Sequence, residues 1–431
     1  MATPRVAARQ QRILGGVREA PVGMYSPVNR RVDFLAVPAF HFRTMKRLLR
    51  MLVAAGCLGR MLADPAPEIA GSLKSIRAVG PEGQGNAAAS AAWKQLAQAN
   101  TAALLPILEA MDGANDYALN WLRAAVDAMA SRELSADGKL PLPELGRFLL
   151  ETRHTPRARR LAFELVARSD AATADHLLAG MLNDPSLEIR QDAVAKVMAQ
   201  ARQSLVASNS PGAVLLYQQA LSHARDVGQI ETISKELTGL GQVVDLQKLF
   251  GFLTEWKVIG PFDNTGNRGF EAVYPPERKI DFAAEHDGKA GKIRWRDYVT
   301  RHPYGMVDMN QPCGKLKEVV AYATADFFSD RAQSVELRLG GKNSWKVWLN
   351  GKLLFGRDEY HTNAEIDQYP MPAQLQPGRN TILVKVCQNE EVEAWTNEWE
   401  FQLRITDALG TPIVSAGPPR TAEARNNSTS N

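Results

Sequence analysis

Hydrophobic and polar residues alternate with a period of two in several short runs of the C-terminal third of the chain. In the run Trp345–Leu349 the odd-numbered positions fall on one face of an extended strand and the even-numbered positions on the other. Asn350-Gly351 follows directly, and this pair favours the positive φ angles of a tight hairpin turn. The pattern predicts an antiparallel β domain over residues 253–410.

Upstream of this domain the hydrophobic period changes to about 3.6, which is typical of amphipathic helices. Three segments align in register, with starts 37 and 31 residues apart: Asn120–Met129, Arg157–Val166 and Glu188–Val197. That spacing favours a repeat built from a pair of helices. We therefore predict helical repeats over residues 87–208. A further helix pair over residues 209–252 is expected to cap the repeats or to connect them to the β domain.

Two other segments carry no periodic apolar pattern. Residues 64–86 are rich in Pro, Ala and Gly, a composition that predicts a linker. Residues 411–431 end in a run of Asn, Ser and Thr, which predicts a disordered tail.

Basic residues gather at the N-terminus. Residues 1–60 hold 11 Lys and Arg against two acidic residues, and the remainder holds 40 against 45, although the whole chain carries +4. The charge balance beyond residue 60 is therefore acidic and lacks the basic patch that nucleic-acid binding requires. A nucleic-acid partner is not expected.

The N-terminal segment 1–63 is expected to be a basic leader. Within it, residues 45–63 resemble a secretory signal, because a basic stretch precedes the short apolar run Met51–Gly59. Nine residues are too few to span a bilayer. The sequence before Cys57 resembles a lipoprotein box, so lipidation at Cys57 and ordinary cleavage near Ala63 are alternatives. We expect an exported protein of the periplasm or cell envelope, held at a membrane only if a lipid anchor is attached.

The order of motifs in the β domain resembles the galactose-binding-like jelly roll. WKVIGPFDN begins at Trp256 and is similar to the first strand of such modules in large exported bacterial proteins. The Asn-Gly hairpin is followed by an irregular loop and then by LQPGRN, which begins at Leu375. The resemblance implies an antiparallel jelly-roll β-sandwich. It does not imply a particular ligand, because this scaffold hosts many functions.

The segment DPSLEIRQDAV, residues 184–194, resembles the signature of HEAT repeats, including the HEAT-like repeats of phycobilin lyases and their non-lyase relatives. The resemblance implies that Asp184 and Arg190 form bonds between neighbouring repeats. Stacks of this kind usually bind other proteins, so a protein partner is expected there. The predicted fold class is multidomain α + β, with an α-helical HEAT-like solenoid followed by an antiparallel jelly-roll β-sandwich.

No catalytic site is legible in the sequence. The chain lacks the H-E-x-x-H and C-x-x-C patterns of zinc sites and the G-x-S-x-G pattern of a nucleophile elbow. Cys313 and Cys387 both fall in the β domain. In an oxidising compartment they would form a disulfide, and the alternative is two buried, reduced thiols.

Two loops of the β domain carry candidate binding residues. Asp263, Asn264 and Asn267 crowd into one turn and are candidate ligands of a structural calcium ion. A network of Asx turns is the alternative, and no other cofactor is expected.

The second set is Tyr360, His361, Asn363 and Trp395, which would offer aromatic stacking and hydrogen bonds to a neutral glycan. The alternative is that Trp395 and Trp399 are packing residues.

The sequence as a whole predicts an exported bacterial, non-catalytic binding or scaffold protein. Its helical repeats would contact a protein partner and its sandwich would bind carbohydrate. An accessory subunit of a polysaccharide-degrading system, a phycobilin-lyase-like protein and a purely structural envelope protein are the alternatives. The lyase alternative rests on the HEAT resemblance alone, and the export signal and the β domain count against it.

Overall fold

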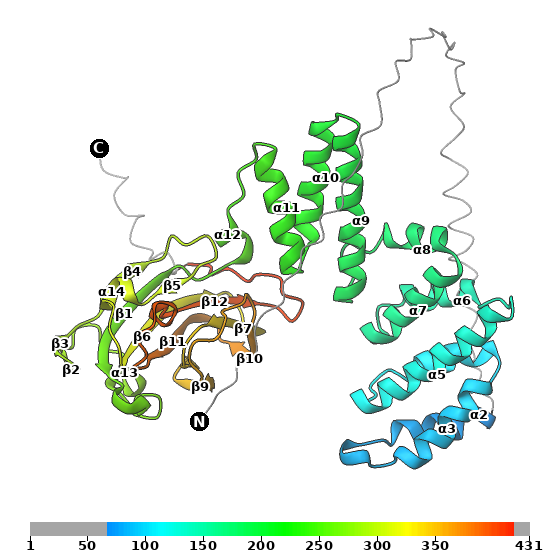
Figure 1. Ribbon diagram of the computed structural model, residues 1–431, viewed down its shortest axis with the longest axis horizontal. Coiled ribbons are helices and arrows are strands. Elements are labelled where there is room, and N and C mark those ends of the chain that lie inside the picture. Colours follow the sequence, from blue (N-terminus) through cyan, green and yellow to red (C-terminus); the bar gives the residue numbers. More distant parts are fainter. Residues whose placement is uncertain (1–66, 418–431) are drawn as a thin grey trace, which may run out of the picture. The chain divides into compact units, whose positions relative to one another are not determined.

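The computed structural model describes residues 67–417 of the chain. The predicted leader, with its signal segment and Cys57, and the end of the predicted tail lie outside these residues. The described chain consists of a helical region, residues 67–250, and an antiparallel β region, residues 252–417 (Figure 1). This confirms the predicted combination of helices followed by antiparallel sheets. Between residues 67 and 417, no helix has both the length and the apolar character needed to cross a membrane.

The helical region is a succession of helices that pack against their neighbours along the chain. They are α2 (Pro67–Arg77), α3 (Asn86–Gln98), α4 (Leu104–Glu109), α5 (Asp116–Ser135), α6 (Leu142–Leu150), α7 (Pro156–Ser169), α8 (Ala171–Leu178), α9 (Leu187–Val206), α10 (Ser210–His223), α11 (Val227–Gly239) and α12 (Leu246–Phe250). One continuous apolar core runs from α2 to α9, and a second joins α9 to α12. Each helix therefore depends on its neighbours for the burial of its apolar face.

The predicted linker over residues 64–86 is contradicted by helix α2. Ile69, Leu73 and Ile76 recur at i, i+4 and i+7 and are buried against the rest of the helical region. Val79, just beyond the helix, is buried as well. The first helix of the region therefore begins about twenty residues earlier than the composition suggested.

Buried polar side chains join successive helix pairs. The Asp184 carboxylate, in the turn before α9, accepts two hydrogen bonds from the Arg159 guanidinium of α7, at 2.8 and 2.5 Å. Arg190 of α9 donates to the backbone carbonyl of His223 at the end of α10, at 2.7 Å. Ser186 occupies the N-cap position of α9, but its side chain makes no capping bond; Asp184 instead accepts from the Ser186 N–H, at 2.8 Å.

The β region contains two main antiparallel sheets and a small separate hairpin. The six-stranded sheet has the order β4 (Arg296–Val299), β1 (Glu255–Asp263), β6 (Val319–Ser329), β11 (Gly378–Gln388), β8 (Trp345–Leu349), β9 (Lys352–Arg357). The four-stranded sheet has the order β10 (Tyr369–Leu375), β7 (Gln333–Gly341), β12 (Glu400–Thr406), β5 (Val307–Asp308). Strands β2 (His286–Gly288) and β3 (Gly291–Ile293) form the hairpin, and α13 (Pro275–Arg278) and α14 (Asn310–Cys313) are short helices.

The two main sheets pack face to face around one apolar core, to which Val258, Ala323 and Val384 contribute from one sheet and Leu337 and Leu403 from the other. The opposite face of the six-stranded sheet, called here the outer face, is also covered. Residues on the chain between β1 and β4 pack there against alternate side chains of β6 and β11. The central strands are therefore buried on both faces, which explains their nearly continuous hydrophobic sequence.

Turns and edges of the sheets follow local sequence. Asn350 and Gly351 have φ angles of +52° and +80° and connect β8 to β9, so the predicted hairpin is confirmed. Strand β10 is an edge strand and carries Pro370 and Pro372. Its pairing with β7 continues through both prolines, so the positions that lack an N–H point away from the sheet.

The predicted boundary of the disordered tail, residue 411, is too early in the sequence. The Ile413 N–H donates to the Ile405 carbonyl at 2.8 Å, and the Ala416 N–H donates to the Phe328 carbonyl at 3.0 Å. Residues 411–416 are therefore held by both sheets. Periodicity did not reveal this segment because it pairs only at isolated positions.

Candidate functional site

Three of the four predicted glycan-binding residues come together at one end of the β region. Tyr360 and His361 lie in the loop between β9 and β10, and Trp395 lies in a short 3₁₀ turn between β11 and β12. The His361 ring meets the Trp395 ring edge-on, with centroids 5.3 Å apart, and the Tyr360 ring lies 6.1 Å from His361. Trp395 is 62% exposed, which is a large fraction for tryptophan. We call these three rings the aromatic cluster.

The other two residues of interest fall outside this cluster. Asn363 is exposed in the same loop, and its backbone carbonyl accepts from Gln368 Nε2 at 2.8 Å. No hydrogen bond within residues 67–417 connects the Asn363 side chain to the aromatic cluster. Trp399 is fully buried in the core between the sheets and is a packing residue.

The backbone and hydrogen bonds of the loops fix the position of His361. This residue has a φ angle of +60°, in the left-handed region. Its Nε2 lies 2.9 Å from Oδ1 of Asn389 and 3.4 Å from Oε2 of Glu391, and its side chain is only 7% exposed. The His361 ring is therefore held by polar side chains of the segment that follows β11, and the Trp395 ring meets it edge-on.

A layer of buried amide and hydroxyl groups supports the aromatic cluster. Asn264 Nδ2 donates to the Tyr360 hydroxyl at 3.1 Å and to the Gln388 carbonyl at 2.9 Å. The Gln388 side chain accepts from Asn343 Nδ2 at 3.1 Å and donates to the Thr396 carbonyl at 3.0 Å. The side chains of Asn264, Asn343 and Gln388 are buried, and so is Thr396. A satisfied network of this kind lowers the conformational freedom that a ligand would otherwise have to restrict.

Sequence reasoning named Asn264 only as a calcium ligand and missed the other supporting residues. Gln388 is the last residue of β11 and Asn389 follows it directly, and polar residues at a strand end read as the beginning of an exposed loop. In the structure both are buried. A polar pair that directly continues a buried strand was the signal that could have identified them.

The electrostatic character of the cluster is that of a neutral site with an acidic border. Burial, followed by the influence of Cys387, raises the pKa of the Tyr360 hydroxyl above its usual value, so Tyr360 is neutral near neutral pH. Glu390, Glu391 and Glu393 are exposed around it. Such a site suits an uncharged ligand better than an anion.

The predicted calcium ligands lie in the turn that follows β1. The Asp263 carboxylate accepts from the Thr265 hydroxyl at 2.7 Å and from the Thr265 N–H at 3.3 Å, and it lies 3.2 Å from the Lys289 ammonium. The hydrogen bond from the Thr265 hydroxyl is the main cause that lowers the pKa of Asp263. Burial opposes it, and Lys289 adds to the lowering. These contacts form an Asx turn closed by an ion pair.

The two asparagines of this turn are also engaged. Asn264 is fully buried, and its Oδ1 accepts from the Gly269 N–H at 2.7 Å. Asn267 Nδ2 donates to the Glu390 carboxylate at 3.1 Å. Within residues 67–417 no group of three or more His, Cys, Asp or Glu side chains is arranged to hold a metal ion. The contacts favour the turn-network alternative, and calcium binding stays a prediction.

Of the two alternatives for Cys313 and Cys387, the structure shows free thiols and no disulfide. Cys387 lies in the apolar cluster on the outer face of the six-stranded sheet, whereas Cys313 in α14 packs against the core between the two sheets. Burial raises the pKa of both thiols to about 12. Neither residue is therefore a thiolate at neutral pH.

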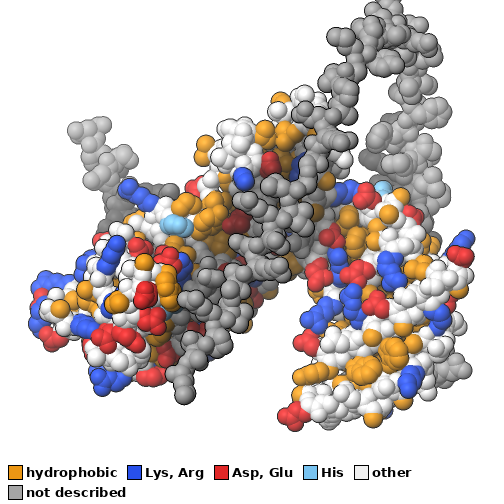
Figure 2. Space-filling view, in the orientation of Figure 1, with side chains coloured by type: hydrophobic (Ala, Val, Ile, Leu, Met, Phe, Trp, Pro, Cys, Tyr) orange, Lys and Arg blue, Asp and Glu red, His pale blue; other side chains and the backbone are white. Residues whose placement is uncertain are grey.

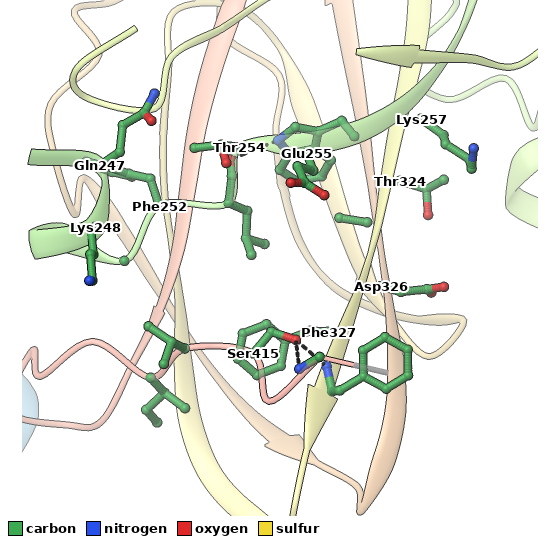
Figure 3. A pocket seen from close by; sticks show the side chains of 18 of the residues that line it. Gln247, Lys248, Phe252, Thr254, Glu255, Lys257, Thr324, Asp326, Phe327 and Ser415 are labelled. Carbon is green, nitrogen blue, oxygen red and sulfur yellow. Dashed lines mark hydrogen bonds between the residues drawn. The ribbon is translucent and has the colours of Figure 1, made fainter. Parts of the chain in front are cut away.

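A cavity of about 770 Å³ lies away from the aromatic cluster. The start of β1, the end of β6, α12 and residues 413–417 line it (Figure 3). The cluster is next to the opposite ends of these strands, beyond Asp263 and Val319. The two sites therefore lie at opposite ends of the six-stranded sheet and share no residue.

Charged side chains of α5, α7 and α9 form a row of ion pairs on the helical region. Arg123 pairs with Glu164 at 2.6 Å, Arg160 pairs with Glu164 at 3.1 Å, and Arg160 also pairs with Asp192. Figure 2 shows basic and acidic side chains intermingled on this region. The row presents alternating charges and thus differs from the uniformly basic surface that a nucleic acid needs.

Comparisons with known proteins do not establish a family. No family model matches the chain, and no curated protein matches it. Among solved structures, part of the chain is similar to a GH31 alpha-xylosidase from Xanthomonas citri, with 14% sequence identity and a TM-score of 0.19. The match covers 36% of this chain and 16% of that one, so the shared part is a small fraction of the xylosidase. A similarity at this level carries no argument about function.

Proposed function

We propose that the chain is a non-catalytic binding protein whose β region holds a neutral glycan weakly at the aromatic cluster. The exposed Trp395 ring, fixed at the edge of His361, is the observation that carries this proposal. An exposed aromatic face stacks on the apolar face of a sugar, and the neighbouring side chains supply hydrogen bonds. Because buried amides hold the loops, little ordering is needed when a ligand binds.

We further propose that the β region is a galactose-binding-like jelly roll and the helical region a HEAT-like solenoid. Two antiparallel sheets around one core support the first assignment. The buried bonds from Arg159 to Asp184 and from Arg190 to His223, which join successive helix pairs, support the second. A protein partner on the helical region is part of the same proposal, since the intermingled charges there suit a protein surface.

The glycan proposal is tested with the full chain on an array of neutral and charged glycans. Trp395→Ala is expected to lower the affinity for a retained neutral glycan about tenfold or more, because the stacked apolar area is lost. The matched control is Val392→Ala, which removes another exposed side chain, 77% accessible, from the same loop. Far-ultraviolet circular dichroism should show both variants folded.

Unchanged retention by Trp395→Ala would contradict the proposal and favour the alternative of a purely structural envelope protein.

Export is proposed on the sequence alone. Native protein that still begins at Met1 and resides in the cytoplasm, as seen by mass spectrometry, would contradict it.

A further inference from the structure

The cavity at the start of β1 exists because the pairing of β1 with β6 stops early. The antiparallel register begins with Lys257 opposite Thr324. If this pairing continued for two more residues, Glu255 of β1 would lie opposite Asp326 of β6. Glu255 pairs instead with Val299 on β4 alone. Like charges directly opposite each other destabilise a ladder, and the separation of the strands keeps these two carboxylates apart.

The edge of β6 is used again beyond the separation. The Phe328 N–H donates to the Ser415 hydroxyl at 2.9 Å, and the Phe328 carbonyl accepts from the Ala416 N–H at 3.0 Å. Residues two apart in a strand direct their backbone groups to the same side. The backbone of Asp326 therefore faces the opening, between the two places where β6 is paired. Figure 3 shows Glu255, Asp326, Phe327 and Ser415 around this open space.

The wall of the cavity combines apolar surface with an excess of negative charge. Its charged residues are Asp245, Glu255, Asp297, Asp326, Lys248 and Lys257. Lys257 is already paired with Asp297. Within residues 67–417, the Glu255 carboxylate has no hydrogen bond or ion pair, and it is exposed toward solvent. The cavity thus offers a carboxylate without a partner next to aromatic and aliphatic walls.

One wall residue already shows how a cation is held here. The ammonium group of Lys257 lies 5.4 Å from the centre of the Phe282 ring, and Phe282 lines the same cavity. This is a cation–π contact reinforced by the Asp297 carboxylate. The cavity is also lined by another aromatic side chain, Phe328, and by the Glu255 carboxylate, and no cation–π contact or ion pair of residues 67–417 uses either of them.

We infer that this cavity binds a basic side chain, lysine or arginine, carried by an extended segment of a protein partner. The volume of about 770 Å³ lies within the range of about 300–1,000 Å³ that is usual for binding cavities. The apolar walls suit the aliphatic stem of such a side chain, and the Glu255 carboxylate suits its charged end. The backbone of Asp326 offers peptide-type hydrogen bonds to the segment that carries it. This site is independent of the proposed glycan site.

The test uses the full chain and two fluorescein-labelled peptides, acetyl-Thr-Val-Lys-Val-Thr-amide and the same peptide with norleucine in place of lysine. Fluorescence anisotropy should show that the lysine peptide binds about tenfold more tightly, because only its ammonium gains a charge-assisted bond. Raising the salt concentration should weaken this preference. Glu255→Gln should abolish it. The matched control is Asp287→Asn, which makes the same change in net charge at a side chain that is 88% exposed on β2.

Three results would overturn the inference. Equal affinities of the two peptides, or no binding of either at about 1 mM peptide, would exclude a basic side chain as occupant. Equal losses in Glu255→Gln and Asp287→Asn would show general charge attraction instead of a site. Tighter binding of a glucosamine oligomer than of the lysine peptide would assign the cavity to a cationic sugar.

Discussion

Replacing Arg159 by methionine should strongly destabilise the helical region. The Arg159 side chain is 1% exposed, and its guanidinium donates two bonds to Asp184, which is 5% exposed, and one to the Leu149 carbonyl at 2.8 Å. Arg159→Met preserves the apolar stem but leaves the Asp184 carboxylate buried, with the Ser186 N–H as its one remaining hydrogen-bond donor among residues 67–417. Removal of one member of a buried ion pair costs about 3–5 kcal/mol, and we expect a loss of that size in the free energy of unfolding.

Arg157 provides a control two residues away on the same helix. It pairs with Asp116, but the side chains are 58% and 78% exposed, so Arg157→Met should cost no more than about 1 kcal/mol. Urea unfolding followed by helical circular dichroism measures both variants. The double variant Arg159→Met, Asp184→Leu should recover much of the loss, because both charges are then removed. Similar losses in Arg157→Met and Arg159→Met, or no recovery in the double variant, would refute the reasoning.

Two other stability predictions concern the β region. Lys385 is fully buried and donates to the Phe270 and Ala272 carbonyls at 2.9 and 2.7 Å and to Glu277 at 2.9 Å, so Lys385→Met should cost about 3 kcal/mol or more in urea unfolding. Burial raises the pKa of Asp367, but the bonds and charges of two arginines outweigh it and lower the net value. Its stabilisation is therefore full above the unfolded-state pKa and is lost as pH falls through the lower folded-state pKa. The stability gap between wild type and Asp367→Asn should shrink on acidification below about pH 4, and a constant gap would contradict the assignment.

Local sequence determined the parts of the fold that were predicted correctly. The Asn350-Gly351 hairpin needs only two residues that tolerate positive φ, and both adopt it. The three segments aligned by apolar spacing, 120–129, 157–166 and 188–197, each fall inside one observed helix, α5, α7 and α9. Helix α2 was missed because the wider segment 64–86 is rich in Pro, Ala and Gly, whereas the spacing of Ile69, Leu73 and Ile76 carried the correct information.

Features that depend on residues far apart in the sequence were harder to predict from the sequence. Two cysteines 74 positions apart suggested a disulfide, but whether they meet depends on which face of a sheet each occupies. The aromatic cluster was predicted because its members are aromatic residues in loops. Its supporting layer was not, since Asn264, Asn343 and Gln388 come from three segments that are far apart in the sequence. The cavity beside Glu255 arises from the register between β1 and β6, which no local pattern encodes.

The prolines of β10 have a consequence for self-association. A sheet grows into a fibril only when both of its edges accept new strands, because each added strand must present an edge to the next. Pro370 and Pro372 remove two successive outward donors from one edge of the four-stranded sheet. An added strand would leave its facing carbonyls without partners there. If two molecules paired through the opposite edge strand, β5, the joined sheet would expose only β10 at both of its ends. No further strand could then be added, so this sheet cannot template continuous polymerisation.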